Sequence, residues 1–365
     1  MEPVFTEIRK QFGFGFMRLP MTGEKVDIPQ TMQMVDTFLE NGFNYFDTAH
    51  GYIGGQSELA LKACLTSRYP RDRYLLTNKL SNNFFETQAE IRPLFQQQLE
   101  ACGVDYFDFY LMHAQSAERF EKYKRARAYE TALALKAEGK IRHLGISFHD
   151  TPEVLDRMLT EYPQIEAVQL QFNYLDYENP KVQSRGCYEV CRRHGKPVFV
   201  MEPVKGGSLV KLPEQAQRIL DELHGGSNAS YAIRFAAGFP GIRVVLSGMS
   251  TLEQVKENVA FMKNFQPLNP QEQAAIERVR GVLCAQGLIP CTGCRYCTEV
   301  CPMEIPIPDL FACLNEKWRT GSANTGGIGG GKPGDCLRCG KCEEICPQQL
   351  NIRGLMLSVR GELGL

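Results

Sequence analysis

The sequence of 365 residues has no excess of either charge, since 41 lysines and arginines are balanced by 42 aspartates and glutamates. Nucleic acids and anionic membranes attract basic proteins, so this balance argues against both kinds of partner. No apolar run approaches the roughly 18 residues that a membrane-spanning helix needs. Met1–Glu7 also lacks the basic and apolar regions of a secretory signal. We therefore expect a cytoplasmic protein with no membrane partner and no nucleic-acid partner.

The length predicts two domains, or one large barrel with an appendage. With 43% apolar and 23% charged residues, the chain has enough apolar material for a sizeable globular core. Cysteine departs from this ordinary composition, because there are 14 cysteines, and eight of the nine between Cys291 and Cys346 form two regularly spaced runs. Regular gaps between these eight, without a secretory signal, indicate metal ligation rather than disulfides.

Short apolar runs alternate with amphipathic stretches over most of the chain, which is the rhythm of βα units. Thr87–Cys102 is one such stretch: its apolar side chains recur on one helical face, and Gly103 predicts the helix end. Eight runs predict strands, namely Phe12–Leu19, Tyr45–Asp47, Tyr74–Lys79, Phe107–His113, His143–Ser147, Ala167–Phe172, Pro197–Met201 and Val244–Ser247. Eight βα units favour a closed (β/α)₈ barrel over an open doubly wound sheet.

A change in composition at Phe265–Pro270, where prolines follow one another closely, marks a break in the chain. We predict a barrel domain over residues 1–270 and a smaller cysteine-rich domain over residues 271–365. The second domain should begin with a helix at Pro270–Leu283. The glycine-rich segment Gly321–Gly334 predicts a flexible loop inside it.

The cysteine-rich domain contains the same pattern twice, C-x₂-C-x₂-C-x₃-C-P. The first run comprises Cys291, Cys294, Cys297 and Cys301, and the second comprises Cys336, Cys339, Cys342 and Cys346. This spacing places three thiolates on a tight loop around one iron–sulfur cube, while the fourth cysteine points elsewhere. Zinc is the alternative, since C-x₂-C pairs also bind zinc, but zinc sites rarely show four cysteines at this spacing.

The two runs resemble a bacterial-type dicluster ferredoxin domain, over about Cys284–Leu350. In two-cluster ferredoxins the fourth cysteine of each run ligates the other cluster. The resemblance therefore implies two [4Fe-4S] clusters with crossed ligands. One would be held by Cys291, Cys294, Cys297 and Cys346, and the other by Cys336, Cys339, Cys342 and Cys301. We expect the remaining cysteines to be small buried hydrophobic residues, namely Cys64, Cys102, Cys187, Cys191, Cys284 and Cys313.

Three predicted strands end in ionisable side chains, at the edge of a barrel where active sites lie. Asp47 closes one strand and is followed by Tyr52, Lys79 ends a second strand, and His113 ends a third. Taken singly, each side chain has an ordinary structural explanation, such as a salt bridge at the rim. Their combination is far more specific.

The order of these four residues resembles the catalytic tetrad of the aldo-keto reductases. The resemblance covers most of Phe12–Phe261 and includes the segments Gly51–Glu58, Gly145–Ser147 and Gly248–Asn258. It implies a (β/α)₈ barrel that interconverts a small-molecule carbonyl and an alcohol, with NADP or NAD as the cofactor.

The resemblance implies that Tyr52 is the general acid and that His113 orients the substrate carbonyl. A phenol has a pKa of about 10. We expect Lys79 to stabilise the phenolate, and Asp47 to keep that lysine charged.

The resemblance also implies the residues that bind the nicotinamide cofactor. Ser147 and Gln169 would hold the carboxamide, Met201 stands where an aromatic ring often stacks, and the adenosine end would be lined by Gly248, Ser250, Gln254, Glu257 and Asn258. Glu202 follows Met201 and would favour the oxidised, cationic ring. No lysine or arginine lies in the segment 248–254 to pair with a 2′-phosphate, so the choice between NADP and NAD stays open.

The presence of both cofactor types leaves several functions open. Hydride transfer moves two electrons and a cluster moves one, and no flavin motif is present to bridge them. The clusters would exchange electrons with a ferredoxin- or flavodoxin-type partner, or they would be structural or sense oxygen or redox state while hydride chemistry proceeds alone. In the alternative, the protein is an electron carrier or redox sensor whose barrel only binds nucleotide or a partner. The intact tetrad favours an enzyme. Arg18, after the first strand, would suit a carboxylate or polyol substrate, or form a salt bridge at the rim.

Overall fold

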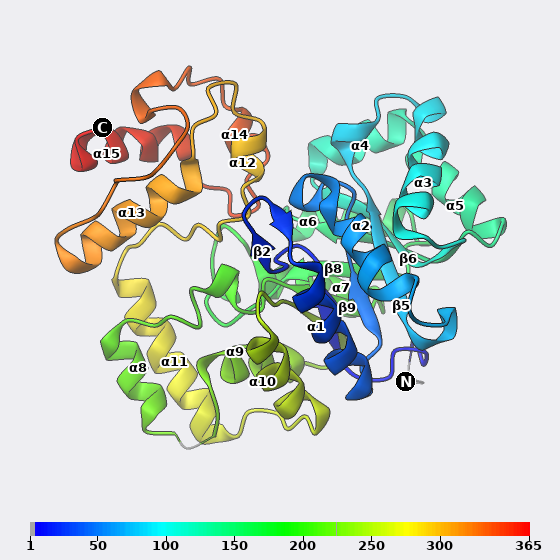
Figure 1. Cartoon of the computed structure of the whole chain (residues 1–365), viewed down its shortest axis with the longest axis horizontal. Coiled ribbons are helices and arrows are strands. Elements are labelled where there is room, and N and C mark those ends of the chain that lie inside the picture. The colour runs from blue at the N-terminus through cyan, green and yellow to red at the C-terminus, as the bar shows by residue number, and fades with distance from the viewer. Residues whose placement is uncertain (1–3, 224) are drawn as a thin grey trace.

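The computed structural model describes residues 4–223 and 225–365. Eight parallel strands close into a barrel in the order β1-β10-β9-β8-β7-β6-β5-β4 (Figure 1). The strands are β1 (Phe12–Gly15), β4 (Tyr45–Asp47), β5 (Leu75–Leu80), β6 (Phe107–Gln115), β7 (Ile141–Phe148), β8 (Ala167–Gln171), β9 (Val198–Met201) and β10 (Ile242–Gly248). All eight coincide with predicted runs, which confirms the predicted (β/α)₈ barrel. A short hairpin of β2 (Met21–Thr22) and β3 (Lys25–Val26) follows β1 and was not predicted.

The interior of the barrel is filled by large apolar side chains. Phe5, from the segment before β1, contacts the rings of Phe109 and Phe199 at 5.0 and 5.9 Å between centroids. Tyr45, Val244 and further strand residues complete this buried cluster. The packed interior leaves the carboxyl ends of the strands as the place for a cavity.

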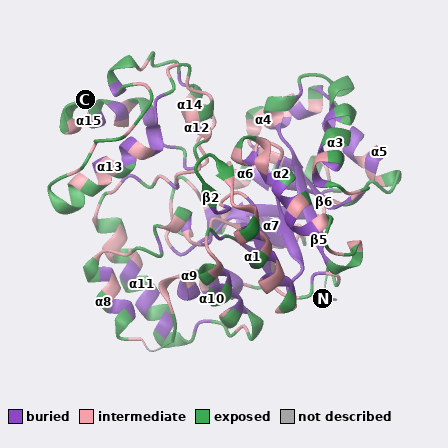
Figure 2. Cartoon of the chain, viewed as in Figure 1, coloured by how far each residue is buried: buried purple, intermediate pink, exposed green. Residues whose placement is uncertain are grey.

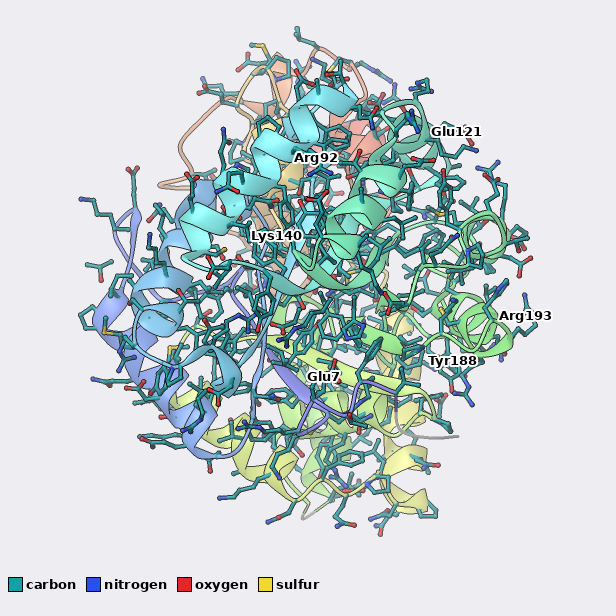
Figure 3. All side chains as sticks on the ribbon, turned by 90° about the vertical axis from the view of Figure 1, so that its right-hand side faces the viewer. Glu7, Arg92, Glu121, Lys140, Tyr188 and Arg193 are labelled. Carbon is teal, nitrogen blue, oxygen red and sulfur yellow. The ribbon has the colours of Figure 1, made fainter. Side chains whose placement is uncertain are left out.

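Helices surround the strands. They are α1 (Ile28–Glu40), α2 (Gln56–Leu61), α3 (Gln88–Cys102), α4 (Ala117–Arg125), α5 (Ala128–Ala137), α6 (Pro152–Glu161), α7 (Ser184–Arg193), α8 (Glu214–Asp221), α9 (Asn228–Ala237), α10 (Leu252–Lys263) and α11 (Pro270–Ala285). Helix α3 begins with a capping box at Thr87 and ends at Gly103, whose φ is +67°. The inner faces of the barrel helices are buried and their outer faces are exposed (Figure 2). Figure 3 shows charged side chains such as Arg92, Glu121 and Arg193 on the outer surface.

The C-terminal domain has a small core of its own. Its helices are α12 (Tyr296–Glu299), α13 (Ile307–Thr320), α14 (Lys341–Glu344) and α15 (Ile352–Leu363). Phe311 and Leu314 from α13 pack with Met356 and Val359 from α15, and the cysteine runs lie around this core. The short helices α12 and α14 occupy equivalent places in the two runs. Figure 1 shows the domain, in orange and red, seated against one side of the barrel.

Helix α11 joins the two domains. Ala275, Ile276 and Val279 on this helix pack against Ala216 of α8 and Tyr231 of α9, in one apolar cluster. The predicted division at residue 270 assigns α11 to the C-terminal domain, whereas its packing partners are barrel helices. The exact boundary stays a prediction. No helix of the described residues combines the length and the apolar character that crossing a membrane requires.

Candidate active site

Three strand ends bring the predicted tetrad together. Asp47 ends β4, Lys79 lies in β5, His113 lies in β6, and Tyr52 begins the 3₁₀ turn η1 (Tyr52–Gly55) that follows β4. Lys79 Nζ is fully buried and donates to Asp47 Oδ1 at 2.7 Å, to the Thr48 carbonyl oxygen at 2.7 Å and to Tyr52 Oη at 3.2 Å. The lysine therefore joins the carboxylate to the phenol in one buried chain of hydrogen bonds.

The pKa values of Tyr52 and Lys79 differ from the expectation drawn from the sequence. Burial raises the pKa of Tyr52 well above that of a free phenol, and the negative charge of Asp47 raises it further. Burial also lowers the pKa of Lys79, against the opposing effect of Asp47. We expected the cation to favour the phenolate, but removal of water from a buried anion is the larger effect. Tyr52 is thus held as a protonated phenol.

His113 is held as a neutral ring. Burial lowers the pKa of His113 well below its ordinary value, and the charge of Lys79 lowers it further. Its Nδ1 hydrogen-bonds Ser81 Oγ at 2.5 Å, and its ring meets that of Tyr52 edge to face, with 6.0 Å between centroids. Within the described chain Nε2 has no hydrogen-bond partner, so it is available to a ligand.

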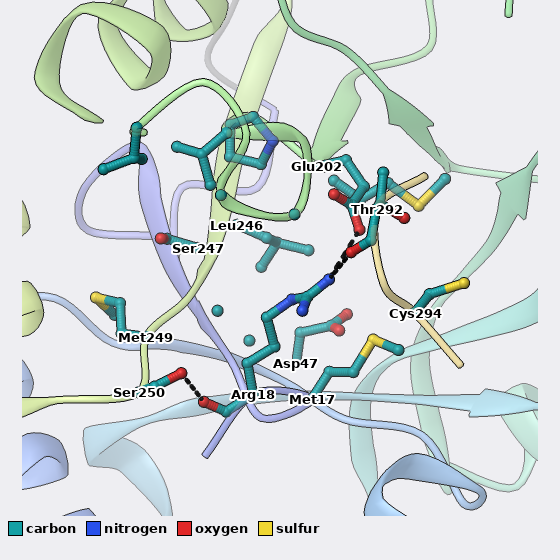
Figure 4. Close-up of a pocket in the computed structure, with 18 of the residues that line it drawn as sticks. Met17, Arg18, Asp47, Glu202, Leu246, Ser247, Met249, Ser250, Thr292 and Cys294 are labelled. Atoms are coloured by element: carbon teal, nitrogen blue, oxygen red, sulfur yellow. Dashed lines mark hydrogen bonds and ion pairs between the residues drawn. The ribbon is translucent and has the colours of Figure 1, made fainter. Parts of the chain in front are cut away.

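A cavity of about 340 Å³, here called the mouth cavity, opens at the carboxyl ends of the strands (Figure 4). Its volume is in the range of ligand pockets. Asp47, Tyr52 and His113 line it. Seven of the eight residues predicted to bind the cofactor also line it, namely Gln169, Met201, Gly248, Ser250, Gln254, Glu257 and Asn258. The cavity therefore runs from the tetrad to the N-terminal part of α10.

Ser147 is the predicted cofactor residue that does not line this cavity. Its Oγ accepts a hydrogen bond from the Ala114 amide at 2.7 Å, which ties the end of β7 to that of β6. Gln169 lines the cavity, but its Nε2 donates to Asp47 Oδ2 at 3.1 Å. Both predicted carboxamide contacts are thus engaged within the protein.

The structure adds residues to the mouth cavity that the sequence reasoning did not assign to the site. His149 follows β7, Lys211 and Gly207 come from the loop after β9, and Gly206 precedes them. Burial lowers the pKa of His149 to about 3, with a further contribution from Arg119. His149 could have been assigned to the site from the sequence, because it lies two residues beyond Ser147. Nothing in the sequence around Lys211 points to the site.

Arg18 reaches across the mouth cavity (Figure 4). Its guanidinium donates to the Thr292 carbonyl oxygen at 2.8 Å and lies 3.8 Å from the Glu202 carboxylate. Burial raises the pKa of Glu202, while the charges of Arg18 and Lys205 oppose this. Since Thr292 belongs to the C-terminal domain, Arg18 connects the barrel to that domain inside the cavity.

The eight motif cysteines gather in two separate small cavities. Cys291, Cys294, Cys297 and Cys346 line the first, called the cluster-I cavity, and Cys301, Cys336, Cys339 and Cys342 line the second, called the cluster-II cavity. The crossed pairing requires this grouping, in which each run contributes three cysteines to one cavity and one to the other. Ligation itself stays a prediction.

Other groupings of these cysteines find no support in the structure. None of the 14 cysteines forms a disulfide. Across residues 4–223 and 225–365, no three histidine, cysteine or acidic side chains are close enough to hold one metal ion. A single zinc ion would need its thiolates that close. Four cysteines around a common cavity suit a larger group such as a cube.

The remaining cysteines divide into two classes. Cys64, Cys102, Cys187 and Cys191 are buried in the barrel, as predicted. Cys284 is exposed and Cys313 is partly exposed, so the prediction of burial was wrong for these two. Cys284 lies on α11, and Cys313 lies on α13, where its Sγ donates to the Asn324 carbonyl oxygen.

The cluster-I cavity adjoins the mouth cavity. Cys294 lines both, and Thr292, Tyr296, Pro347 and Gln348 complete the wall of the mouth cavity on this side. Gly206, with a φ of +63°, packs so closely on Thr292 that a side chain there would collide with the Thr292 backbone. The C-terminal domain thus closes one side of the barrel mouth.

Comparison with known proteins identifies both parts of the chain. A model described as the aldo/keto reductase family matches residues 11–280. This chain belongs to the aldo/keto reductase family. A second model, described as a 4Fe-4S dicluster domain, matches residues 290–350. Both predicted resemblances are thereby confirmed, and the dicluster domain implies 4Fe-4S clusters.

Relatives of this aldo/keto reductase are distant. It is 26% identical to an NADH-specific methylglyoxal reductase of Escherichia coli, over 62% of this chain and 82% of that protein. It is 26% identical to an L-galactose dehydrogenase of Arabidopsis thaliana, over 74% of this chain and 89% of that protein.

Solved structures show the same fold. The holo form of an aldo-keto reductase from Bacillus halodurans superposes with a TM-score of 0.60 at 26% identity, over 74% of this chain and 92% of that chain. An aldo/keto reductase from Klebsiella pneumoniae, in complex with NADP and acetate, gives a TM-score of 0.61 at 22% identity, over 74% and 91%. The second likeness concerns the fold alone.

Proposed function

We propose that this protein is an NAD(P)-dependent aldo-keto reductase that interconverts the carbonyl and alcohol forms of a small molecule. We further propose that its two [4Fe-4S] clusters serve electron transfer or redox sensing. One observation carries the proposal: Asp47, Tyr52 and the neutral His113 line one cavity with seven predicted cofactor residues, and the buried Lys79 joins Asp47 to Tyr52 behind its wall.

The tetrad supports a proton-transfer role for Tyr52. Its raised pKa keeps the hydroxyl protonated until a carbonyl oxygen draws the proton away. Lys79 Nζ, 3.2 Å from Tyr52 Oη, then stabilises the phenolate. When Ser81 donates to His113 Nδ1, His113 Nε2 carries the proton and donates a hydrogen bond to the substrate oxygen.

The mouth cavity fits an extended nicotinamide dinucleotide, which supplies the hydride when bound. Gln169 and Met201 would hold the nicotinamide, while Ser250, Gln254 and Asn258 would hold the adenosine. Arg18 and Lys211 also line the cavity and would offer positive charge to the diphosphate. Relatives include a reductase named as NADH-specific and structures holding NADPH or NADP, so they do not decide between the cofactors.

The two cysteine cavities fit cubane clusters by donor type and number. Such clusters supply one-electron transfer. Cys339, in the cluster-II cavity, is exposed, and the neighbouring Leu337 is 63% exposed. This exposed side supports a ferredoxin- or flavodoxin-type protein as the partner.

A purely binding or sensing role for the barrel is the alternative. A fully buried lysine is costly to desolvate, and its carboxylate partner offsets only part of that cost. A binding role gives no reason for this arrangement beside a phenol and a neutral histidine. The tetrad therefore favours the enzyme.

Turnover of full-length, anaerobically prepared protein tests the proposal. Small aldehydes, ketones and alcohols, including methylglyoxal and L-galactose, would be supplied with NADH or NADPH, or with the oxidised forms. Fluorescence titration would measure nucleotide binding on the same samples. We expect binding of at least one nucleotide and turnover of at least one carbonyl. Failure of both nucleotides to bind would contradict the proposal and favour the alternative.

A second experiment separates electron transfer from sensing. NADH or NADPH would be added anaerobically to protein with oxidised clusters, and bleaching of the cluster absorbance followed. Bleaching supports electron exchange between the mouth cavity and the clusters. No bleaching, with nucleotide binding intact, supports a sensing or structural role.

A further inference from the structure

Tyr296 belongs to the loop of the first cysteine run, between Cys294 and Cys297, yet it lines the mouth cavity of the barrel. Arg295, just before it, has a φ of +66°, which turns the chain sharply at the start of α12. The Arg295 guanidinium forms two hydrogen bonds with the Asp309 carboxylate, at 2.7 and 3.0 Å. The turn that directs Tyr296 toward the barrel is therefore braced.

The Tyr296 side chain meets the Tyr52 hydroxyl. The two hydroxyl groups lie next to each other inside the mouth cavity. Lys79 Nζ donates to the Tyr52 oxygen at 3.2 Å. The Tyr52 hydroxyl therefore has two polar neighbours, the Lys79 ammonium group and the Tyr296 hydroxyl. The His113 ring is a third neighbour, with 6.0 Å between its centroid and that of Tyr52.

We propose that Tyr296 is a positioning residue for carbonyl reduction, whose hydroxyl orients that of Tyr52 and whose ring closes the mouth cavity. The inference rests on the proposed function and extends it. It makes the loop that holds cluster I part of the reductase site. A hydrogen bond to an oxygen on which negative charge develops contributes most when the charge is formed. The contribution of Tyr296 should therefore appear in kcat rather than in cofactor affinity.

Tyr296→Phe tests this directly, because it removes the hydroxyl and keeps the ring. We expect kcat for carbonyl reduction to fall about 10- to 100-fold, somewhat less than the loss of a donor that touches the substrate. The dissociation constant for NADH or NADPH and the iron content should stay within about twofold of wild type, because neither depends on this hydroxyl.

Tyr174→Phe is the matched control. Tyr174 is 1% exposed, and its hydroxyl has no hydrogen-bond partner in the structure. It therefore removes a buried tyrosine hydroxyl outside the mouth cavity, and we expect wild-type kcat. If both variants lose kcat equally, the effect is general and the inference is overturned.

A spectroscopic measurement does not depend on turnover. Tyr52→Phe removes the hydroxyl group next to that of Tyr296, beside two predicted ligands of cluster I. The electron paramagnetic resonance signal of reduced cluster I should shift in this variant, while that of cluster II stays unchanged. Identical spectra in wild type and variant would contradict the contact.

The outcomes separate this inference from the proposed function. If Tyr296→Phe keeps full kcat while Tyr52→Phe is inactive, the inference fails and the proposed function stands. If Tyr52→Phe is also fully active, the proposed function fails. Loss of iron from Tyr296→Phe would show a structural role in the cluster loop and would overturn the positioning role. Tyr296→Ala provides an independent check, since an opened cavity should admit bulkier carbonyls.

Discussion

Gln348 and Gln171 exchange two hydrogen bonds across the junction of the two domains, at 2.8 and 3.1 Å. Lys205 Nζ also donates to Gln348 Oε1 at 2.8 Å, and pairs with the buried Asp176. Gln348 lies two residues after Cys346, the only cysteine that the second run contributes to the cluster-I cavity. The network therefore anchors the segment carrying this predicted cluster ligand directly to the barrel.

Gln348→Ala should destabilise the protein by about 1–3 kcal/mol, because Gln171 and Lys205 lose hydrogen-bond partners in a buried setting. Anaerobic urea unfolding followed by circular dichroism would measure the change in the free energy of unfolding. Gln97→Ala, at an exposed position on α3, is the control and should change it by less than about 0.5 kcal/mol. Equal stability of the two variants would show that the network does not anchor the domain.

Cys346→Ser should remove the cluster of the first run, although Cys346 belongs to the second. Iron and sulfide content should fall from about eight to about four atoms per chain, the content of one cube. Mössbauer or paramagnetic resonance spectra would identify which cluster is lost. Cys313→Ser, outside both cavities, should keep the full content. Loss of only the cluster-II signal in Cys346→Ser would contradict the crossed ligation.

His149→Gln should make the free energy of unfolding less dependent on pH. The pKa of His149 is about 3 in the folded protein, whereas an unfolded histidine has a pKa of about 6.5. The unfolded state therefore binds a proton first, and stability is lost as pH falls below about 6.5. Between about pH 7.5 and about pH 5.5, wild type should lose up to about 1.4 kcal/mol more than the variant. Urea unfolding at both pH values measures this, and identical losses would show that His149 stays exposed to water when folded.

The strands were predictable because a parallel barrel strand is buried on both sides and reads as a short apolar run. The tetrad was predictable in position for a related reason, since the carboxyl ends of parallel strands meet at one rim. The grouping of the cysteines followed from their spacing together with the resemblance to two-cluster ferredoxins. Each of these features depends on residues that are close in sequence or on a regular topology.

The docking of the second domain was not predictable in this way. Gln171 and Gln348 are 177 positions apart, and neither has a neighbour that marks it as an interface residue. In the sequence, Tyr296 is only one of the residues between two cluster cysteines. Its position beside Tyr52 is seen only in the folded structure. The direction of the pKa shift of Tyr52 was missed because burial, which the sequence does not measure, outweighs the neighbouring charges.

Carbonyl reduction by Tyr52→Phe tests the central claim most directly, since the phenol is the proposed proton donor. The assay would use full-length protein with intact clusters, a carbonyl that wild type reduces, and circular dichroism to confirm the fold. We predict that kcat falls by about 10² to 10⁴, the usual cost of losing a well-placed general acid, while nicotinamide affinity stays nearly unchanged. Full activity of Tyr52→Phe on that carbonyl would contradict the account.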